Sequence, residues 1–181
     1  MKTTAKIAAV LLTFLFVTVL TAQDSSNGDT PKWIVTKISE EAGTTRSLPS
    51  SDYMKESYRD VSMNDCRLGY TVVLYNSLTK STVTDKVSVP LDKNTSVSVI
   101  HDFVKDAIDD YAIQISTASK TIVIDRTRET DGRIESEDVS SIDRTNIIFG
   151  KPNAERGDTV SRVQKGLAHA IQVCSESTRK M

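Results

Sequence analysis

The chain has 181 residues, a formal net charge of −1, 26% charged and 38% hydrophobic residues. This near-neutral balance gives no electrostatic reason to expect nucleic acid or an anionic membrane as a partner. The sequence contains seven glycines, and none of them forms a glycine-rich phosphate loop, so we expect no nucleotide cofactor. The length suits one domain with a modest core.

The first 22 residues have the features of a secretory signal peptide. Lys2 and Lys6 precede an apolar run over residues 7–20, and Ala22 supplies a small residue at the cleavage position. The apolar run is shorter than the ~20 residues that cross a bilayer. We therefore expect cleavage after Ala22, a flexible leader over residues 23–30, no later membrane span, and a secreted or periplasmic protein.

The two cysteines, Cys66 and Cys174, both follow this segment. In an exported chain an even cysteine count favours a disulfide. Two buried thiols that never meet remain the alternative, because sequence alone does not set the distance between them. No Cys-x-x-Cys motif occurs and neither histidine is near a cysteine in the sequence, which argues against a metal site or a redox pair.

The N-terminal part after the leader, residues 31–57, is predicted to be a short helix and a loop. Thr30 and Pro31 form an N-cap and a first helical residue, and Gly43 marks the end of a helix over residues 31–42. Trp33 is expected to anchor the core. Residues 44–56 are rich in Ser, Thr and Pro and indicate a loop.

Strand patterns dominate the middle of the chain. A short strand is predicted over residues 58–63, a turn at Asn64 and Asp65, and a long strand over residues 67–76. A turn over residues 77–80 leads to a partner strand over residues 81–89, which Pro90 ends by removing a hydrogen-bond donor.

The next region is less regular. Residues 98–110 indicate a short strand or loop followed by a helix of one to three turns. Residues 112–115 and 121–125 are predicted to pair as an antiparallel hairpin. Residues 126–141 carry many charges and no apolar run, which indicates an exposed loop, and residues 142–149 form the final strand.

Residues 153–176 form an amphipathic helix. One face carries Val160, Val163, Gln164, Leu167, Ala170, Ile171 and Cys174, and the other carries Arg162, Lys165, His169 and Glu176. Such a helix needs a surface to cover. We therefore predict an α+β fold in which an antiparallel β-sheet, or a partly open barrel, is closed by the C-terminal helix, with a short N-terminal helix.

Three local motifs together resemble a family of small exported bacterial domains of unknown function. They are residues 65–68 (Asp-Cys-Arg-Leu), residues 87–92 (Val-Ser-Val-Pro-Leu-Asp), and residues 153–156 followed by 167–174. The resemblance covers residues 58–176, leaving 177–181 as a tail, and implies a pleckstrin-homology-like architecture. Folds of this kind support unrelated functions.

Few residues suggest a catalytic or metal-binding site. His101 and Asp102 could orient an imidazole, but no nucleophile or metal motif accompanies them. Asp106, Asp109 and Asp110 lack the spacing and glycine of a calcium loop. The acidic residues between 129 and 138 are interleaved with arginines, which favours a solvated surface over a cation site. His169 is expected on the solvated face of the last helix, and Asn94-Thr95-Ser96 matches a glycosylation acceptor.

The preferred hypothesis is an exported, non-enzymatic binding or protein-interaction module, without metal or cofactor, for a protein or small ligand. One alternative is an exported hydrolase that lacks a recognisable motif, with His101 and Asp102 as first candidates. The other is a structural or assembly factor of the cell envelope. An exposed sheet edge or the segment 126–141 is the expected surface for a partner.

A thiol titration tests the predicted disulfide. The purified protein, denatured without reductant, should show no reactive thiol, because both sulfurs are bonded. Prior treatment with dithiothreitol should release two thiols per chain. Two reactive thiols before reduction would contradict the bridge.

Overall fold

The computed structural model describes residues 31–47, 51–100, 110–150 and 154–177. These residues form two helices and nine strands. In chain order they are α1 (Pro31–Glu41), β1 (Gly43–Ser47), β2 (Tyr53–Asn64), β3 (Arg67–Asn76), β4 (Ser81–Pro90), β5 (Thr95–Ile100), β6 (Tyr111–Thr117), β7 (Ile122–Thr130), β8 (Arg133–Ile142), β9 (Arg144–Gly150) and α2 (Ala154–Ser177).

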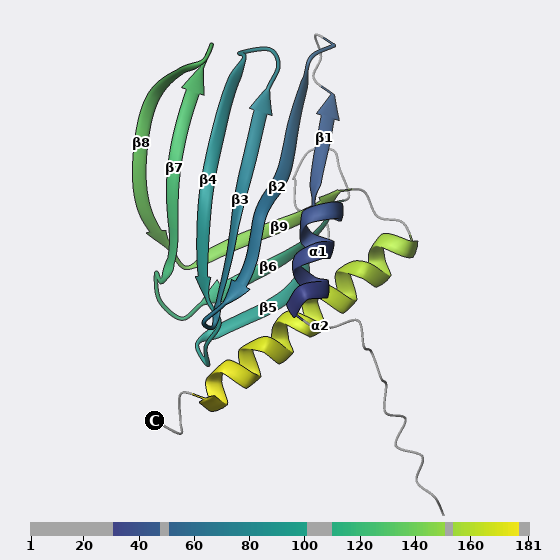
Figure 1. The fold of residues 1–181 in the computed structure, drawn as a ribbon. Coiled ribbons are helices and arrows are strands. Elements are labelled where there is room, and N and C mark those ends of the chain that lie inside the picture. The colour runs from purple at the N-terminus through teal and green to yellow at the C-terminus, as the bar shows by residue number, and fades with distance from the viewer. Residues whose placement is uncertain (1–30, 48–50, 101–109, 151–153, 178–181) are drawn as a thin grey trace, which may run out of the picture.

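The strands form two antiparallel sheets. The large sheet has six strands in the order β1-β2-β3-β4-β7-β8, and the small sheet has three in the order β5-β6-β9. The strands of the small sheet run across those of the large sheet and cover only the half that ends at the turn between β2 and β3 (Figure 1). The fold is therefore α+β, as predicted, and the sheets do not close into a barrel.

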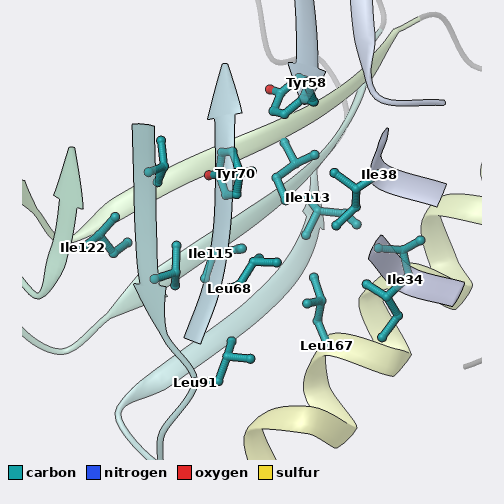
Figure 2. Packing of buried hydrophobic residues seen from close by; sticks show 14 of the residues in the cluster. Ile34, Ile38, Tyr58, Leu68, Tyr70, Leu91, Ile113, Ile115, Ile122 and Leu167 are labelled. Carbon is teal, nitrogen blue, oxygen red and sulfur yellow. The ribbon is translucent and has the colours of Figure 1, made fainter. Parts of the chain in front are cut away.

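The helices lie at the side and end of this arrangement. α1 packs on β2, and α2 runs along β5 and contacts both β6 and α1 (Figure 1). Ile34 and Ile38 of α1 and Leu167 of α2 are fully buried among residues of both sheets (Figure 2). The largest fully buried side chains also include Leu68, Val89, Leu91, Ile113, Ile115, Ile122, Ile147 and Phe149. The predicted apolar face of the last helix thus covers one end of a single core.

A disulfide between Cys66 and Cys174 joins the turn that follows β2 to the last turns of α2, with 5.6 Å between the two Cα atoms. Asp65 and Cys66 both have positive φ, 48° and 56°, as in a two-residue hairpin turn whose twist matches that of the strands. The N–H of Leu91 donates to the carbonyl oxygen of Cys66 at 2.8 Å. The turn is thus held to the segment that follows β4 as well as to α2.

The predicted hairpin between residues 112–115 and 121–125 is wrong. Both segments are strands, but β6 pairs with β5 and β9 in the small sheet, whereas β7 pairs with β4 and β8 in the large sheet. Residues 118–121 therefore cross from one sheet to the other. The physical reason is burial: Ile124 pairs with Val87 of β4, and Ile122 and Ile124 are both buried and complete the apolar surface of the large sheet.

The two predicted loops are also wrong. Within residues 44–56, β1 pairs with the first part of β2. Residues 126–141 form the second half of β7, a turn at Asp131 and Gly132, and most of β8. Both turn residues have positive φ, 49° and 76°, which an Asp-Gly hairpin turn adopts readily. The strand part of 98–110 is confirmed by β5, whereas the helix predicted within it falls on residues 101–109, outside the described residues.

Neither helix in the described part of the chain combines the length and the apolar character needed to cross a membrane.

Truncation of the central buried residue of α2 tests how much the helix contributes to the stability of the fold. Leu167→Ala should lower the free energy of unfolding by about 3 kcal/mol, because it removes apolar contacts and leaves a cavity. The measurement is urea unfolding followed by circular dichroism. Val173→Ala, on the same helix but 52% exposed, is the matched control and should change stability by less than ~1 kcal/mol. Equal effects of the two substitutions would show that α2 does not close the core.

Candidate functional site

A groove with a charged pair inside it, hereafter the sheet groove, lies where the inner face of the large sheet passes the edge of β9. Its volume is about 350 Å³, within the range of ligand pockets in proteins. The aliphatic lining comes from β3, β4, β7 and β9, and the polar lining from β2, β4, β7 and β9. The lining residues are Glu56, Tyr58, Val72, Leu74, Val83, Asp85, Val87, Ile124, Arg126, Thr145, Asn146 and Ile148.

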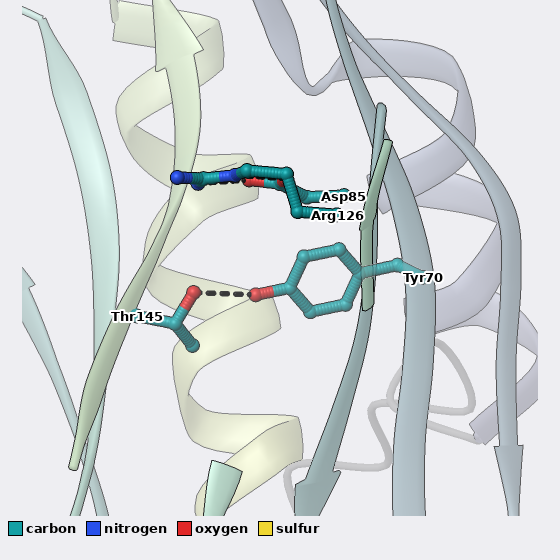
Figure 3. Close-up of polar contacts among 4 residues, drawn as sticks. All are labelled: Tyr70, Asp85, Arg126 and Thr145. Atoms are coloured by element: carbon teal, nitrogen blue, oxygen red, sulfur yellow. Dashed lines mark hydrogen bonds and ion pairs between the residues drawn. The ribbon is translucent and has the colours of Figure 1, made fainter. Parts of the chain in front are cut away.

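An ion pair lies within this groove. The Nε and Nη2 atoms of Arg126 donate to the two carboxylate oxygens of Asp85 at 2.7 and 2.6 Å. The side chains come from opposite positions of β7 and β4 and extend from the large sheet in the same direction as Tyr70 (Figure 3). The Asp85 side chain is 17% exposed and that of Arg126 is 38% exposed. The hydrogen bond from Arg126 to Asp85 raises the pKa of the guanidinium, so Arg126 stays charged.

Two tyrosines connect the groove to the small sheet. The Tyr58 hydroxyl donates to Glu56 Oε1 at 2.5 Å and accepts the backbone N–H of Ile148 at 3.1 Å. The Tyr70 hydroxyl lies 2.9 Å from the hydroxyl of Thr145 (Figure 3). Burial raises the pKa of Tyr58 well above its usual value, and the nearby Glu56 carboxylate adds to the shift. Burial likewise raises the pKa of Tyr70. Both hydroxyls therefore remain protonated.

A second cavity, of about 330 Å³, lies beside the disulfide and between the two helices. It is mostly apolar, and its lining includes Ile34, Leu91, Ala170 and both cysteines, with His169 also at its wall. His169 is exposed, as expected for the polar face of α2. The described lining of this cavity contains no arginine or lysine, so no arginine–carboxylate pair like that of the sheet groove lies in its wall.

Of the residue pairs singled out in the sequence, the described part of the chain brings together Cys66 and Cys174. His101, Asp102, Asp106 and Asp109 lie outside the described residues, and Asp110 is fully buried. The acidic residues between 129 and 138 lie on the β7–β8 hairpin. Among the residues with described coordinates, no group of three or more His, Cys, Asp or Glu side chains could hold a metal ion.

Sequence reasoning missed Asp85 and Arg126, although a signal was present. Asp85 has the same alternation phase as Val83, Val87 and Val89, and Arg126 continues the phase of Ile122 and Ile124. A charged residue on the buried phase of a strand indicates a partner across the sheet. Trp33, predicted as a core anchor, is half-buried, packs against the core, and has the Arg162 guanidinium 4.3 Å from its ring centroid.

Comparison with known proteins finds no match: no protein-family profile, no curated protein and no solved structure is significantly similar to this chain. The resemblance to pleckstrin-homology-like exported domains therefore stays a prediction.

The buried tyrosines lead to a prediction for alkaline pH. The folded protein raises the pKa of Tyr58 and Tyr70 above the ordinary value of 10.0. Their contribution to stability is therefore complete below pH 10 and is lost as the pH rises toward the folded-state values. Tyrosinate absorbance should show two tyrosines that ionise only when the protein unfolds.

The variant Tyr58→Phe/Tyr70→Phe supplies the control. It should remove both late-ionising groups and flatten the fall of unfolding free energy above pH 10. It should also lower stability at neutral pH, because the N–H of Ile148 loses its acceptor. Ionisation of both residues in the folded protein would contradict the prediction.

Proposed function

We propose that this protein is an exported, non-enzymatic binding module that holds a small amphipathic ligand, neutral or positively charged, in the sheet groove. The observation that supports this function best is the combination of an open aliphatic surface with a fixed charged pair inside it. Apolar walls with a few placed polar groups are the usual composition of ligand sites.

The apolar part of the proposal rests on residues of the large sheet that the small sheet leaves uncovered. Val72, Leu74 and Val83 point toward the groove and are only partly buried. Their neighbours one or two rows along the same strands, Tyr70 and Val87, are buried in the core. A ligand that covered the three partly exposed side chains would extend the core and gain hydrophobic free energy.

The charge preference follows from the polar lining. Glu56 and Asp85 contribute two carboxylates and Arg126 one guanidinium. The guanidinium already makes a two-pronged hydrogen bond with Asp85, so an added anion would compete with Asp85 for it. A ligand with a hydroxyl, amide or cationic group is therefore favoured over an anionic one.

The exported location is supported by the predicted signal peptide and by the disulfide. Disulfides between distant cysteines form and persist in oxidising compartments. The hydrolase alternative rests on His101 and Asp102, which lie outside the described residues, so no described geometry favours it.

A fluorescent probe and a groove-filling substitution test the proposal. The neutral probe N-phenyl-1-naphthylamine should bind the purified protein with increased emission. Val83→Trp should fill the groove and weaken binding by at least ~10-fold, because an indole occupies most of the volume that the probe needs. Emission titrations give the dissociation constants.

The matched control is Thr84→Trp, which places the same indole on the opposite face of the same strand. It should leave probe binding unchanged. Ala170→Trp, which fills the cavity beside the disulfide, separates the two sites. Binding lost with Ala170→Trp but kept with Val83→Trp would place the probe in the second cavity and contradict the proposal.

A further inference from the structure

Strands at the edge of a sheet carry unpaired N–H and C=O groups that can pair with another chain. The two sheets have four such edges, formed by β1, β8, β5 and β9. The four edges differ in length and in what covers them, and this difference identifies one of them as an interaction surface.

Both edges of the small sheet are occupied by side chains of the same chain. At β5, the Gln164 Nε2 of α2 donates to the carbonyl oxygen of Val97 at 3.3 Å, and α2 packs along the strand. At β9, the hydroxyl of Tyr58 accepts the N–H of Ile148 at 3.1 Å and lies 3.4 Å from the carbonyl oxygen of Asn146. Neither edge offers a free ladder to an added strand.

The edges of the large sheet are unequal. β1 has 5 residues and lies against β9, whereas β8 has 10 residues. Residues 133–139 of β8 are all exposed, including Ile134 at 63% and Val139 at 68%. In Figure 1, β8 forms the outermost strand of the sheet, and no described helix or strand lies along the edge that faces away from β7. A long edge of this kind with exposed aliphatic residues is normally covered or blunted.

The register shows how the exposed side chains are arranged. Ser136 to Ile142 pair without interruption with β7, and the ladder shifts by one residue at Glu135. Val139 lies opposite Asp125, and beyond the bulge Ile134 lies opposite Glu129. The bulge thus places Ile134 on the same face as Val139, with Glu137 between them. This is the outer face of the large sheet, which points away from the small sheet. The uninterrupted part of the edge thus spans seven residues.

The charges of β8 select among possible partners. The strand carries Arg133 and three acids, Glu135, Glu137 and Asp138. Pairing of β8 with β8 of a second copy would bring two acidic strands together, which is unfavourable. A strand with basic residues would instead form opposite-charge pairs across the new ladder.

We propose that β8 is a docking edge that adds an extended, lysine- or arginine-rich segment of another protein as a seventh strand of the large sheet. Backbone hydrogen bonds would supply affinity. Glu137 on the outer face and Asp138 on the inner face would select a strand with adjacent basic residues, and Ile134 and Val139 would favour aliphatic residues on either side of them. This surface is separate from the sheet groove, and the proposal holds whether or not the groove binds a ligand.

A synthetic peptide tests the proposal with the full-length protein. The probe is a blocked ten-residue peptide in which adjacent pairs of lysines are flanked by valines, with its affinity measured by fluorescence anisotropy at low ionic strength. We expect saturable binding and slower amide hydrogen exchange over residues 136–142. Glu137→Lys should weaken binding roughly three- to tenfold, because an attractive cross-strand pair becomes repulsive. Glu40→Lys, with the same charge change on α1, should have no effect.

Two control peptides complete the test. N-methylation of alternate backbone amides should abolish binding if the peptide adds as a strand, and replacement of its lysines by glutamate should also abolish it. Absence of binding by the lysine peptide would overturn the proposal. Equal binding of the N-methylated peptide, or protection outside β8, would do so as well. Dimerisation through β8, detected by sedimentation, would assign the edge to a second copy instead.

Discussion

The hydroxyl group of Tyr58 joins the two sheets, and the arrangement of the molecule depends on this contact. β9 is an edge strand, and its N–H and C=O groups point toward the large sheet. An unpaired group buried there would cost about 1–3 kcal/mol. Tyr58 removes this cost by accepting the N–H of Ile148 at 3.1 Å, and Glu56 holds the tyrosine proton on the other side. One side chain of the large sheet thus sets how closely the small sheet can approach.

The difference in size between the sheets produces both the core and the groove. Three strands that cross the large sheet cover about 14 Å, at ~4.8 Å per strand, whereas ten residues of a strand extend about 33 Å. The small sheet therefore buries only one half of the inner face, where the isoleucines and leucines are concentrated. In the other half the strands continue with Val72, Leu74 and Val83 and with the Asp85–Arg126 pair. The side chains of the inner face therefore change from aliphatic to a mixture of aliphatic and charged where the small sheet ends.

The sequence was sufficient for features that depend on local pattern, and insufficient for features that depend on pairing. The amphipathic face of the last helix, the long β3–β4 hairpin and the disulfide could be predicted because periodicity and cysteine count specify them. Alternation does not identify a strand's partner, so the crossover from β6 to β7 was taken for a hairpin. β8 was taken for a loop because neither of its faces is buried, although Asp131-Gly132 is a strong turn signal. The groove could not be predicted, since it exists only where two distant segments meet.

The disulfide imposes an order on events during the synthesis of the chain. Cys66 and Cys174 are separated by 108 residues, and seven of the nine described strands, β3 to β9, lie between them. At ~5–20 residues per second, the first sulfur waits on the order of 5–20 s for its partner to leave the ribosome. The strands between them can pair during this interval with both ends of the loop unrestrained. Oxidation cannot precede the synthesis of Cys174, so the bridge closes its loop only after β3 to β9 have all been made.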